Sequence, residues 1–205
     1  MLKRTSINFV NKTLAKNNNW NILDIGCGYT PNKNATIIAD KQNLANHYKD
    51  KNLVRILEKK LPFKDKEFDF VIASHVIEHV EDFEFFIKEL ERISSRGYIE
   101  LPSRLGDNLV FENKNDHIWW FAYDDIKNQI VASKRNQLIA PFITVSMAKV
   151  FEKVFRESLV IELIWEEKIN YEIDDELRQK DFETISFFKI VKKYLSKKIR
   201  TVFKK

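Results

Sequence analysis

Two glycines separated by one residue follow the first strongly apolar stretch of the chain, in the sequence NILDIGCGYTP at residues 21–31. Glycine at positions 26 and 28 allows backbone turns, and a close approach by a ligand, that a side chain would prevent. An apolar stretch, an acidic residue and spaced glycines are typical of the turn that holds a nucleotide in α/β proteins. The sequence therefore raises the question of which nucleotide this turn could hold.

The residues after the glycines disfavour binding of a phosphate. The dinucleotide pattern G-x-G-x-x-G needs a third glycine where this chain has Pro31, and proline has no N–H to donate. A P-loop needs Gly-Lys-Ser/Thr, which does not follow. A ligand without phosphate, such as S-adenosylmethionine, needs only close backbone approach. Asp40, sixteen residues after Asp24, would then end the second strand and accept hydrogen bonds from ribose hydroxyls.

A second group of residues suited to chemistry lies in DHIWWF, residues 116–121. His117 can transfer a proton, and its neighbours combine charge with aromatic surface, as the walls of substrate pockets do. We expect the substrate to contact Asp116, Trp119 and Trp120. We expect His117 to be the first candidate for a catalytic base, and His75 the second.

These residues can act together only if the fold brings them to one edge of a sheet. Apolar stretches predict strands at 20–25, 35–40, 53–57, 68–73 and 98–102, and the periodicity of apolar residues predicts helices at 6–18 and after Asp82. Strands alternating with helices predict a doubly wound α/β sheet with ligands at its C-terminal edge. Beyond Pro102 we expect a polar loop, then a helix from about Asp124 to Arg135, a strand pair within 159–173 and a final helix at 183–203.

The sequence resembles the class I S-adenosylmethionine-dependent methyltransferases, in the small-molecule branch with a type 11 domain. The resemblance rests on ILDIGCG, Asp40, LPFKDKEFDFVIASHVIEHVED and RGYIELPS, which follow the family's order and spacing over roughly residues 20–103. It implies a Rossmann-like, doubly wound, mostly parallel sheet with a terminal antiparallel strand pair and helices on both faces. It also implies S-adenosyl-L-methionine as the cofactor.

The resemblance assigns roles to matching positions. The cofactor-binding residues that it implies are Asp24, Gly26, Gly28, Asp40, Ser74 and His75. Among them, Asp40 would bind the ribose and Asp24 the methionine end. Two positions depart from the family: Thr30 replaces the third motif glycine, and Leu57 replaces an acid. We therefore expect the neighbouring Glu58, or else the backbone, to bind the adenine amino group.

Three histidines near acidic residues raise the question of a metal site. His75 and His79 flank Glu78, and His117 follows in the later loop. The family uses the stretch around Glu78 as a turn from strand to helix. We therefore expect Glu78 and His79 to fix that turn by hydrogen bonds, and we expect no metal.

Composition and charge place the chain among globular proteins, with a distinct C-terminal segment. A hydrophobic share of 44% is enough for a packed core. The single cysteine and the lack of a leader-like apolar run favour a cytoplasmic protein. Residues 186–205 carry seven lysines, one arginine and no acid. We expect a methyltransferase domain at 1–185, with its substrate loop at about 103–123. We expect a basic amphipathic helix at 186–205. It would either dock on the domain with a solvated face or be attracted to an anionic membrane, an acidic glycan or RNA, with peripheral contact with anionic membrane as the version that we carry forward.

The class of molecule that accepts the methyl group is indicated mainly by motifs that the sequence lacks. It contains neither the Asp/Asn-Pro-Pro-Tyr/Phe tetrapeptide nor the Pro-Cys nucleophile of DNA methyltransferases. We therefore expect no DNA substrate, but a small molecule or glycan methylated at oxygen or nitrogen. Two alternatives stay open: a methyltransferase of RNA or protein, and a non-catalytic methyltransferase-like module acting through its basic helix.

Overall fold

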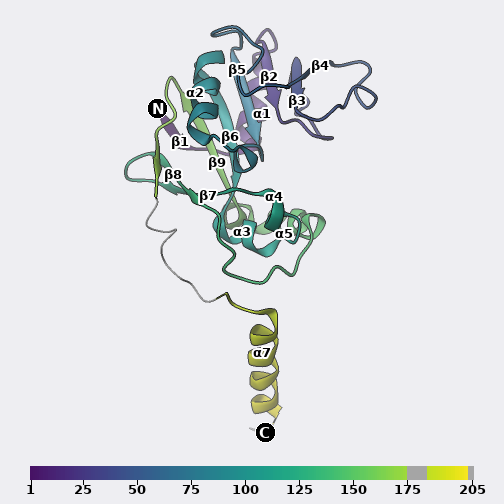
Figure 1. The fold of residues 1–205 in the computed structure, drawn as a ribbon, viewed down its shortest axis with the longest axis vertical. Coiled ribbons are helices and arrows are strands. Elements are labelled where there is room, and N and C mark those ends of the chain that lie inside the picture. Colours follow the sequence, from purple (N-terminus) through teal and green to yellow (C-terminus); the bar gives the residue numbers. More distant parts are fainter. Residues whose placement is uncertain (175–183, 203–205) are drawn as a thin grey trace.

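The computed structural model describes residues 1–174 and 184–202, which form two sheets and the helices around them (Figure 1). The strands are β1 (Leu2–Arg4), β2 (Ile22–Ile25), β3 (Ile37–Asp40), β4 (Asn52–Arg55), β5 (Phe70–Ser74), β6 (Arg96–Pro102), β7 (Trp119–Asp124), β8 (Gln129–Lys134), β9 (Val160–Glu166) and β10 (Tyr171–Ile173). The helices are α1 (Ile7–Lys16), the 3-10 turn η1 (Ile77–His79), α2 (Phe83–Ile93), α3 (Arg104–Leu109), α4 (Asn113–Asp116), α5 (Val145–Leu159) and α7 (Phe187–Val202).

The main sheet has the strand order β1-β9-β6-β5-β2-β3-β4. The five strands from β6 to β4 are parallel, whereas β9 runs antiparallel to β6 and β1 antiparallel to β9. The predicted fold class is thereby confirmed. The antiparallel end of the sheet is made by β9 with the N-terminal β1, rather than by two strands within 159–173.

Helices cover both faces of this sheet because alternate strand residues point to opposite sides. On one face, Val10 and Leu14 of α1 pack against Phe70 and Ile72. On the other, the apolar side of α2 packs against the intervening strand residues. Both helices begin at the capping residues that the sequence indicates. The Ser6 side chain accepts a hydrogen bond from the N–H of Phe9 in α1, and the Asp82 side chain accepts one from the N–H of Phe85 in α2. None of the described helices is both long and apolar enough to cross a lipid bilayer.

The predicted helix at 124–135 is wrong. β7 and β8 form an antiparallel hairpin there, with Trp119 opposite Lys134 and Asp124 opposite Gln129. The alternation in QIVASK turns Ile130 and Ala132 into the core, which is the period of a strand and not of a helix. β10 then pairs in parallel with β8, so β9 and β10 are both strands but join different sheets.

The predicted substrate loop at 103–123 is also more structured than expected. It contains α3, α4 and most of β7. Together with α5, these elements lie beyond the C-terminal ends of the parallel strands (Figure 1). We call residues 103–159 the cap. Its two ends adjoin, because the N–H of Ser103 donates to the carbonyl of Leu159 over 2.8 Å.

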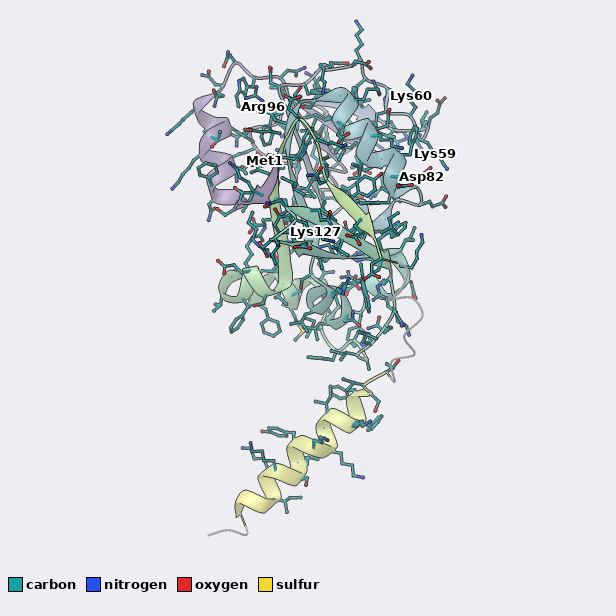
Figure 2. The ribbon with its side chains drawn as sticks, turned by 90° about the vertical axis from the view of Figure 1, so that its left-hand side faces the viewer. Met1, Lys59, Lys60, Asp82, Arg96 and Lys127 are labelled. Carbon is teal, nitrogen blue, oxygen red and sulfur yellow. The ribbon has the colours of Figure 1, made fainter. Side chains whose placement is uncertain are left out.

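The residues just before α7 and the first residue of that helix contact the cap. Ile185 pairs with Ile139 as a short bridge, and the rings of Phe142 and Phe187 lie 6.2 Å apart. The rest of the helix extends away from the body of the protein, with its side chains exposed around it (Figure 2). Residues 203–205, the end of the expected helix, lie outside the described residues.

Candidate active site

The turn after β2 depends on two glycines with left-handed backbone. Gly26 has φ +68° and Gly28 φ +49°. The N–H groups of Gly26 and Cys27 both donate to the carbonyl of Ala39, at the end of β3. A Cβ on Gly26 would lie 2.1 Å from Cγ2 of Val76, whereas a Cβ on Gly28 would meet nothing within 4 Å. The first glycine is therefore needed for packing, and the second leaves an open space beside the turn.

Two buried aspartates hold this turn. The Asp24 carboxylate accepts the N–H of Asn32 over 2.6 Å, and burial raises the pKa of Asp24 to about 6. The Asp40 carboxylate accepts the N–H of Gly28 over 2.9 Å and the N–H of Gln42 over 2.8 Å. These carboxylates fix the backbone around the open space, and both also line cavities.

Two adjoining cavities open at the C-terminal edge of the sheet. The first has a volume of about 440 Å³ and lies between the sheet edge and the cap; Asp24, Ser74, Glu100 and His117 line it. The second, of about 940 Å³, is lined by Asp40, Ile56, Leu57, Glu58 and Asp116. Both are lined by Gly26, Gly28, His75 and His79. The structure thus brings most of the residues selected from the sequence to one continuous region.

His75 lies where the two cavities meet, directly after β5, with φ +53°. Its Nδ1 lies 3.2 Å from a carboxylate oxygen of Glu78, and its Nε2 lies 3.0 Å from one of Glu100. Desolvation opposes protonation of the ring, whose side chain is 41% exposed, but the hydrogen bonds with Glu100 and Glu78 outweigh it and raise the pKa of His75 to about 10. A raised pKa favours the protonated ring at neutral pH, which makes His75 a weaker candidate for a catalytic base than His117.

Glu100 belongs to a buried polar network that the sequence analysis missed. The Tyr98 hydroxyl donates to Glu100 and to Glu162, and Arg156 of α5 forms ion pairs with both carboxylates. Although burial opposes ionisation, His75 and the other partners lower the pKa of Glu100 to about 2. The network ties the cap to the sheet beneath the first cavity. Its signal was present, since a glutamate interrupts each of the apolar stretches YIELP and VIELIW.

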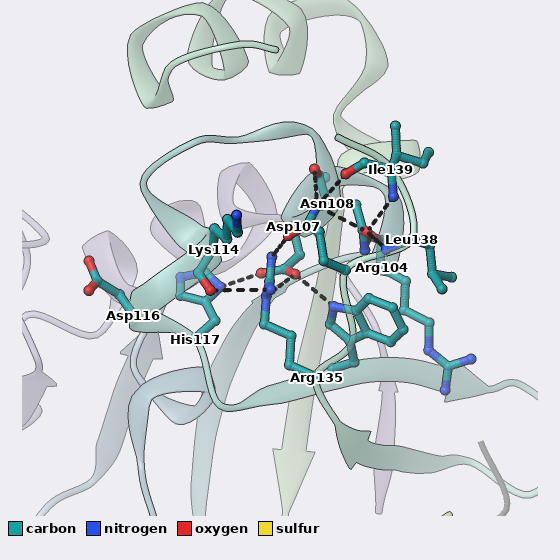
Figure 3. A network of polar contacts seen from close by, with 12 residues as sticks. Arg104, Asp107, Asn108, Lys114, Asp116, His117, Arg135, Leu138 and Ile139 are labelled. Carbon is teal, nitrogen blue, oxygen red and sulfur yellow. Dashed lines mark hydrogen bonds and ion pairs between the residues drawn. The ribbon is translucent and has the colours of Figure 1, made fainter. Parts of the chain in front are cut away.

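His117 is held by a second buried carboxylate, that of Asp107 in α3. Its Nδ1 lies 2.5 Å from Asp107 Oδ1, while Asp107 Oδ2 accepts from Trp120 Nε1 and Arg135 Nε, each over 2.7 Å (Figure 3). Asp107 is 1% exposed. The arrangement leaves Nε2 of His117 as the ring nitrogen without this hydrogen bond, at the wall of the first cavity. Asp107 was not selected from the sequence, where nothing distinguishes it from a solvated helix residue.

The two tryptophans selected as substrate contacts do not line either cavity. Both are buried in β7, with 6% and 5% exposure for Trp119 and Trp120. The indole N–H of Trp119 donates to the carbonyl of Val80 over 2.8 Å, and that of Trp120 donates to Asp107. The pair therefore anchors the segment that carries His117. Asp116 does line the second cavity.

Comparison with known proteins adds a family model and distant structural likenesses. Residues 23–99 match the family model described as a methyltransferase domain. No curated protein matches the chain.

Among solved structures, the chain is similar to the YcgJ protein of Bacillus subtilis, with 19% identity and a TM-score of 0.40 over 47% of this chain and 50% of that one. It is also similar to an S-adenosylmethionine-dependent methyltransferase of Thermotoga maritima, with 16% identity and a TM-score of 0.46 over 73% and 83%. A third, from Aquifex aeolicus, has 12% identity and a TM-score of 0.40 over 76% and 88%. The chain spans half or less of the length of the first three solved structures that it matches.

Proposed function

We propose, since residues 23–99 match the model of a methyltransferase domain, that this chain is a class I S-adenosylmethionine-dependent methyltransferase. We propose further that it methylates a small molecule or glycan at oxygen or nitrogen. The observation that carries the proposal is the pair of adjoining cavities. The glycine turn lines both cavities, Asp40 lines the second, and His117 lines the first. Such a layout can hold a cofactor and an acceptor end to end, as displacement at a methyl carbon requires.

The residues present fit the cofactor. Gly28 leaves open space beside the turn, and Asp40 offers its carboxylate at the wall of the second cavity, where it would bind the ribose. The apolar wall at Ile56 and Leu57, with Glu58 beside it, suits an adenine ring and its amino group. Asp24 and Ser74 of the first cavity would bind the methionine end.

When bound, S-adenosylmethionine supplies a methyl group on a positively charged sulfur. The chain's own contribution is to hold the acceptor atom close to and in line with that carbon, in the first cavity. A hydroxyl acceptor must also lose its proton as the new bond forms. His117 is the residue suited to receive it, because Asp107 fixes the ring through Nδ1, which leaves Nε2 without this hydrogen bond, and because His117 lines the first cavity. His75 would act by position and charge.

Calorimetry with S-adenosylmethionine tests the cofactor half of the proposal. We expect micromolar binding that Asp40→Ala weakens at least tenfold, whereas Lys12→Ala on the exposed side of α1 leaves it unchanged. A chain that binds no cofactor would instead be the non-catalytic module.

A screen of small-molecule and glycan extracts with radiolabelled cofactor tests the acceptor half. His117→Ala should reduce turnover while cofactor affinity stays within threefold. Label found only in RNA or protein would contradict the proposed acceptor class. A loss of cofactor affinity together with activity would mean that His117 is structural.

We also propose that α7 contacts anionic membrane. Its exposed apolar residues include Phe188, Leu195 and Ile199, and five lysines are distributed along the described helix. A helix that presents apolar and basic side chains to solvent suits the surface of an anionic bilayer. Helix α5 of the cap also exposes apolar residues, among them Val154 and Phe155.

Co-sedimentation with phosphatidylcholine vesicles, with and without phosphatidylserine, tests this contact. Each lysine near an anionic surface contributes about 1 kcal/mol, so Lys192→Glu with Lys193→Glu should weaken binding by at least about 30-fold. Lys12→Glu with Lys16→Glu on α1 makes the same charge change away from α7. Equal losses in the two double variants would show only a general charge effect.

A further inference from the structure

Three side chains from two separate segments meet at the wall of the first cavity. Glu78 and His79 belong to η1, and His117 lies directly after α4. One potential ligand atom from each lies within 4.8 Å of the other two, and all three residues line the cavity. We propose that Glu78, His79 and His117 bind a divalent ion of a first-row transition metal.

The hydrogen bonds of the two histidines prepare both rings for a metal. Nδ1 of His79 lies 2.9 Å from the carbonyl oxygen of Asp116. A carbonyl only accepts, so this nitrogen carries the proton and Nε2 is left with a lone pair. The carboxylate of Asp107 fixes His117 in the same way. Metal-bound histidines almost always donate their other N–H to a carboxylate or a carbonyl, and here each ring has one of the two.

Glu78 supplies the negative charge that a dication needs. Its side chain is 0% exposed. One oxygen, Oε1, lies against His75, while Oε2 is buried and has no hydrogen-bond partner among the described residues. A buried carboxylate oxygen without a partner costs several kcal/mol unless something compensates it. A bound cation would satisfy this oxygen and the two imidazole lone pairs together.

Backbone hydrogen bonds hold these groups next to one another, although His79 and His117 are 38 positions apart in the sequence. The N–H of Ile118 donates to the carbonyl of Glu78 over 2.8 Å, and Trp119 bonds the carbonyl of Val80. The rings of His79 and His117 meet edge to face with centroids 4.6 Å apart. Ligand atoms around a zinc-like ion lie about 3–3.5 Å apart, so small side-chain rotations would close the site.

The donor set indicates the kind of ion. Two imidazole nitrogens and one carboxylate suit zinc, iron(II), cobalt(II) or manganese(II), whereas magnesium and calcium prefer oxygen ligands alone. Three protein ligands leave coordination positions open, and these face the first cavity.

The role of the ion rests on the proposed methyl transfer. Coordination of an acceptor hydroxyl would fix its oxygen and lower its pKa, which favours oxygen over nitrogen as the methylated atom. In that case His117 acts as a ligand rather than as the proton acceptor itself.

Cobalt(II) is a suitable probe because its visible absorption reports ligand number and type. Tag-free full-length protein is stripped with chelator and titrated with CoCl2, and competition with ZnCl2 follows. We expect one equivalent to bind with d–d bands of a four- or five-coordinate site. Glu78→Gln and His117→Ala should each weaken binding at least 100-fold, whereas His47→Ala, which removes an exposed histidine outside both cavities, should not change it. Circular dichroism checks that each variant is folded.

Wild-type protein that binds no stoichiometric cobalt would overturn the inference, whatever the variants do. Folded variants that retain wild-type affinity would also overturn it. Calorimetry with S-adenosylmethionine on the stripped protein separates this result from the proposed function. Cofactor binding without cobalt binding refutes the metal site alone, and cobalt binding without cofactor binding refutes the methyltransferase proposal alone.

Discussion

Alanine at Gly26 and at Gly28 should have different effects, although the two glycines are neighbours in one turn. Both have left-handed φ, which costs a residue with a side chain about 1–2 kcal/mol. Only at Gly26 would the new methyl group collide, 2.1 Å from Cγ2 of Val76, and such overpacking costs about 1–3 kcal/mol more. Gly26→Ala should therefore lower the free energy of unfolding by about 2–5 kcal/mol, and Gly28→Ala by about 1–2 kcal/mol.

Urea denaturation measures both values, and Val76→Ala provides the test of cause. In the Val76→Ala variant both Cγ atoms of residue 76 are absent, so Gly26→Ala should lower the free energy of unfolding by little more than Gly28→Ala does. A double-mutant cycle isolates the coupling between Gly26 and Val76. Cofactor affinity should show the opposite order, because the methyl group on Gly28 enters the space beside both cavities. Equal destabilisation by the two alanines, or a coupling near zero, would refute the reasoning.

Three further predictions concern buried carboxylates. Burial raises the pKa of Asp24 to about 6 from an ordinary 3.8; the folded chain therefore holds that proton more tightly, and stability from this group is lost as pH rises from about 4 to 6. Asp24→Asn should remove this dependence, which amounts to about 2 kcal/mol of the free energy of unfolding between pH 4.5 and 7.5. Urea denaturation at these two pH values measures it, and an unchanged pH profile would contradict it. Glu100→Gln should lower the free energy of unfolding by about 3–5 kcal/mol at pH 7, since it leaves His75 and Arg156 without their shared carboxylate. The control Glu157→Gln, at an exposed position, should lower it by less than about 0.5 kcal/mol in the same urea denaturation experiment. Asp107→Asn should weaken cobalt binding about 10–100-fold without abolishing it; wild-type affinity would mean that Asp107 does not orient His117.

The placement of the glycine turn beside its two aspartates could be predicted from the sequence because the signals are local. The strand β2 with Asp24, the glycine turn and Asp40 at the end of β3 follow one another within twenty residues. The strands β2 and β3 are consecutive in the sequence and also pair with each other in the sheet. The paired aspartates and both glycines accordingly lie together. The five parallel strands were also predicted, since each is an apolar stretch bounded by polar residues.

The cap could not be predicted in the same way. Whether 124–135 forms a helix or a hairpin depends on what covers Ile130 and Ala132. Both belong to a core cluster that also contains residues of α2, which is distant from them in sequence. Trp119 and Trp120 resembled a pocket wall because aromatic residues line both pockets and cores. Asp107 acquires its role only from three partners, the most distant of which is 28 residues away.

The pairing of Pro102 with Val160 has a consequence for how such an enzyme could diversify. The chain leaves the sheet at one of these residues and returns at the other, its antiparallel partner in the register, with Ser103 hydrogen-bonded to Ser158 and Leu159. Everything between is an insertion with adjacent ends, the arrangement in which whole segments are exchanged most readily. Acceptor preference could thus change by replacement of 57 residues as one cassette, while the cofactor-binding strands kept their sequence.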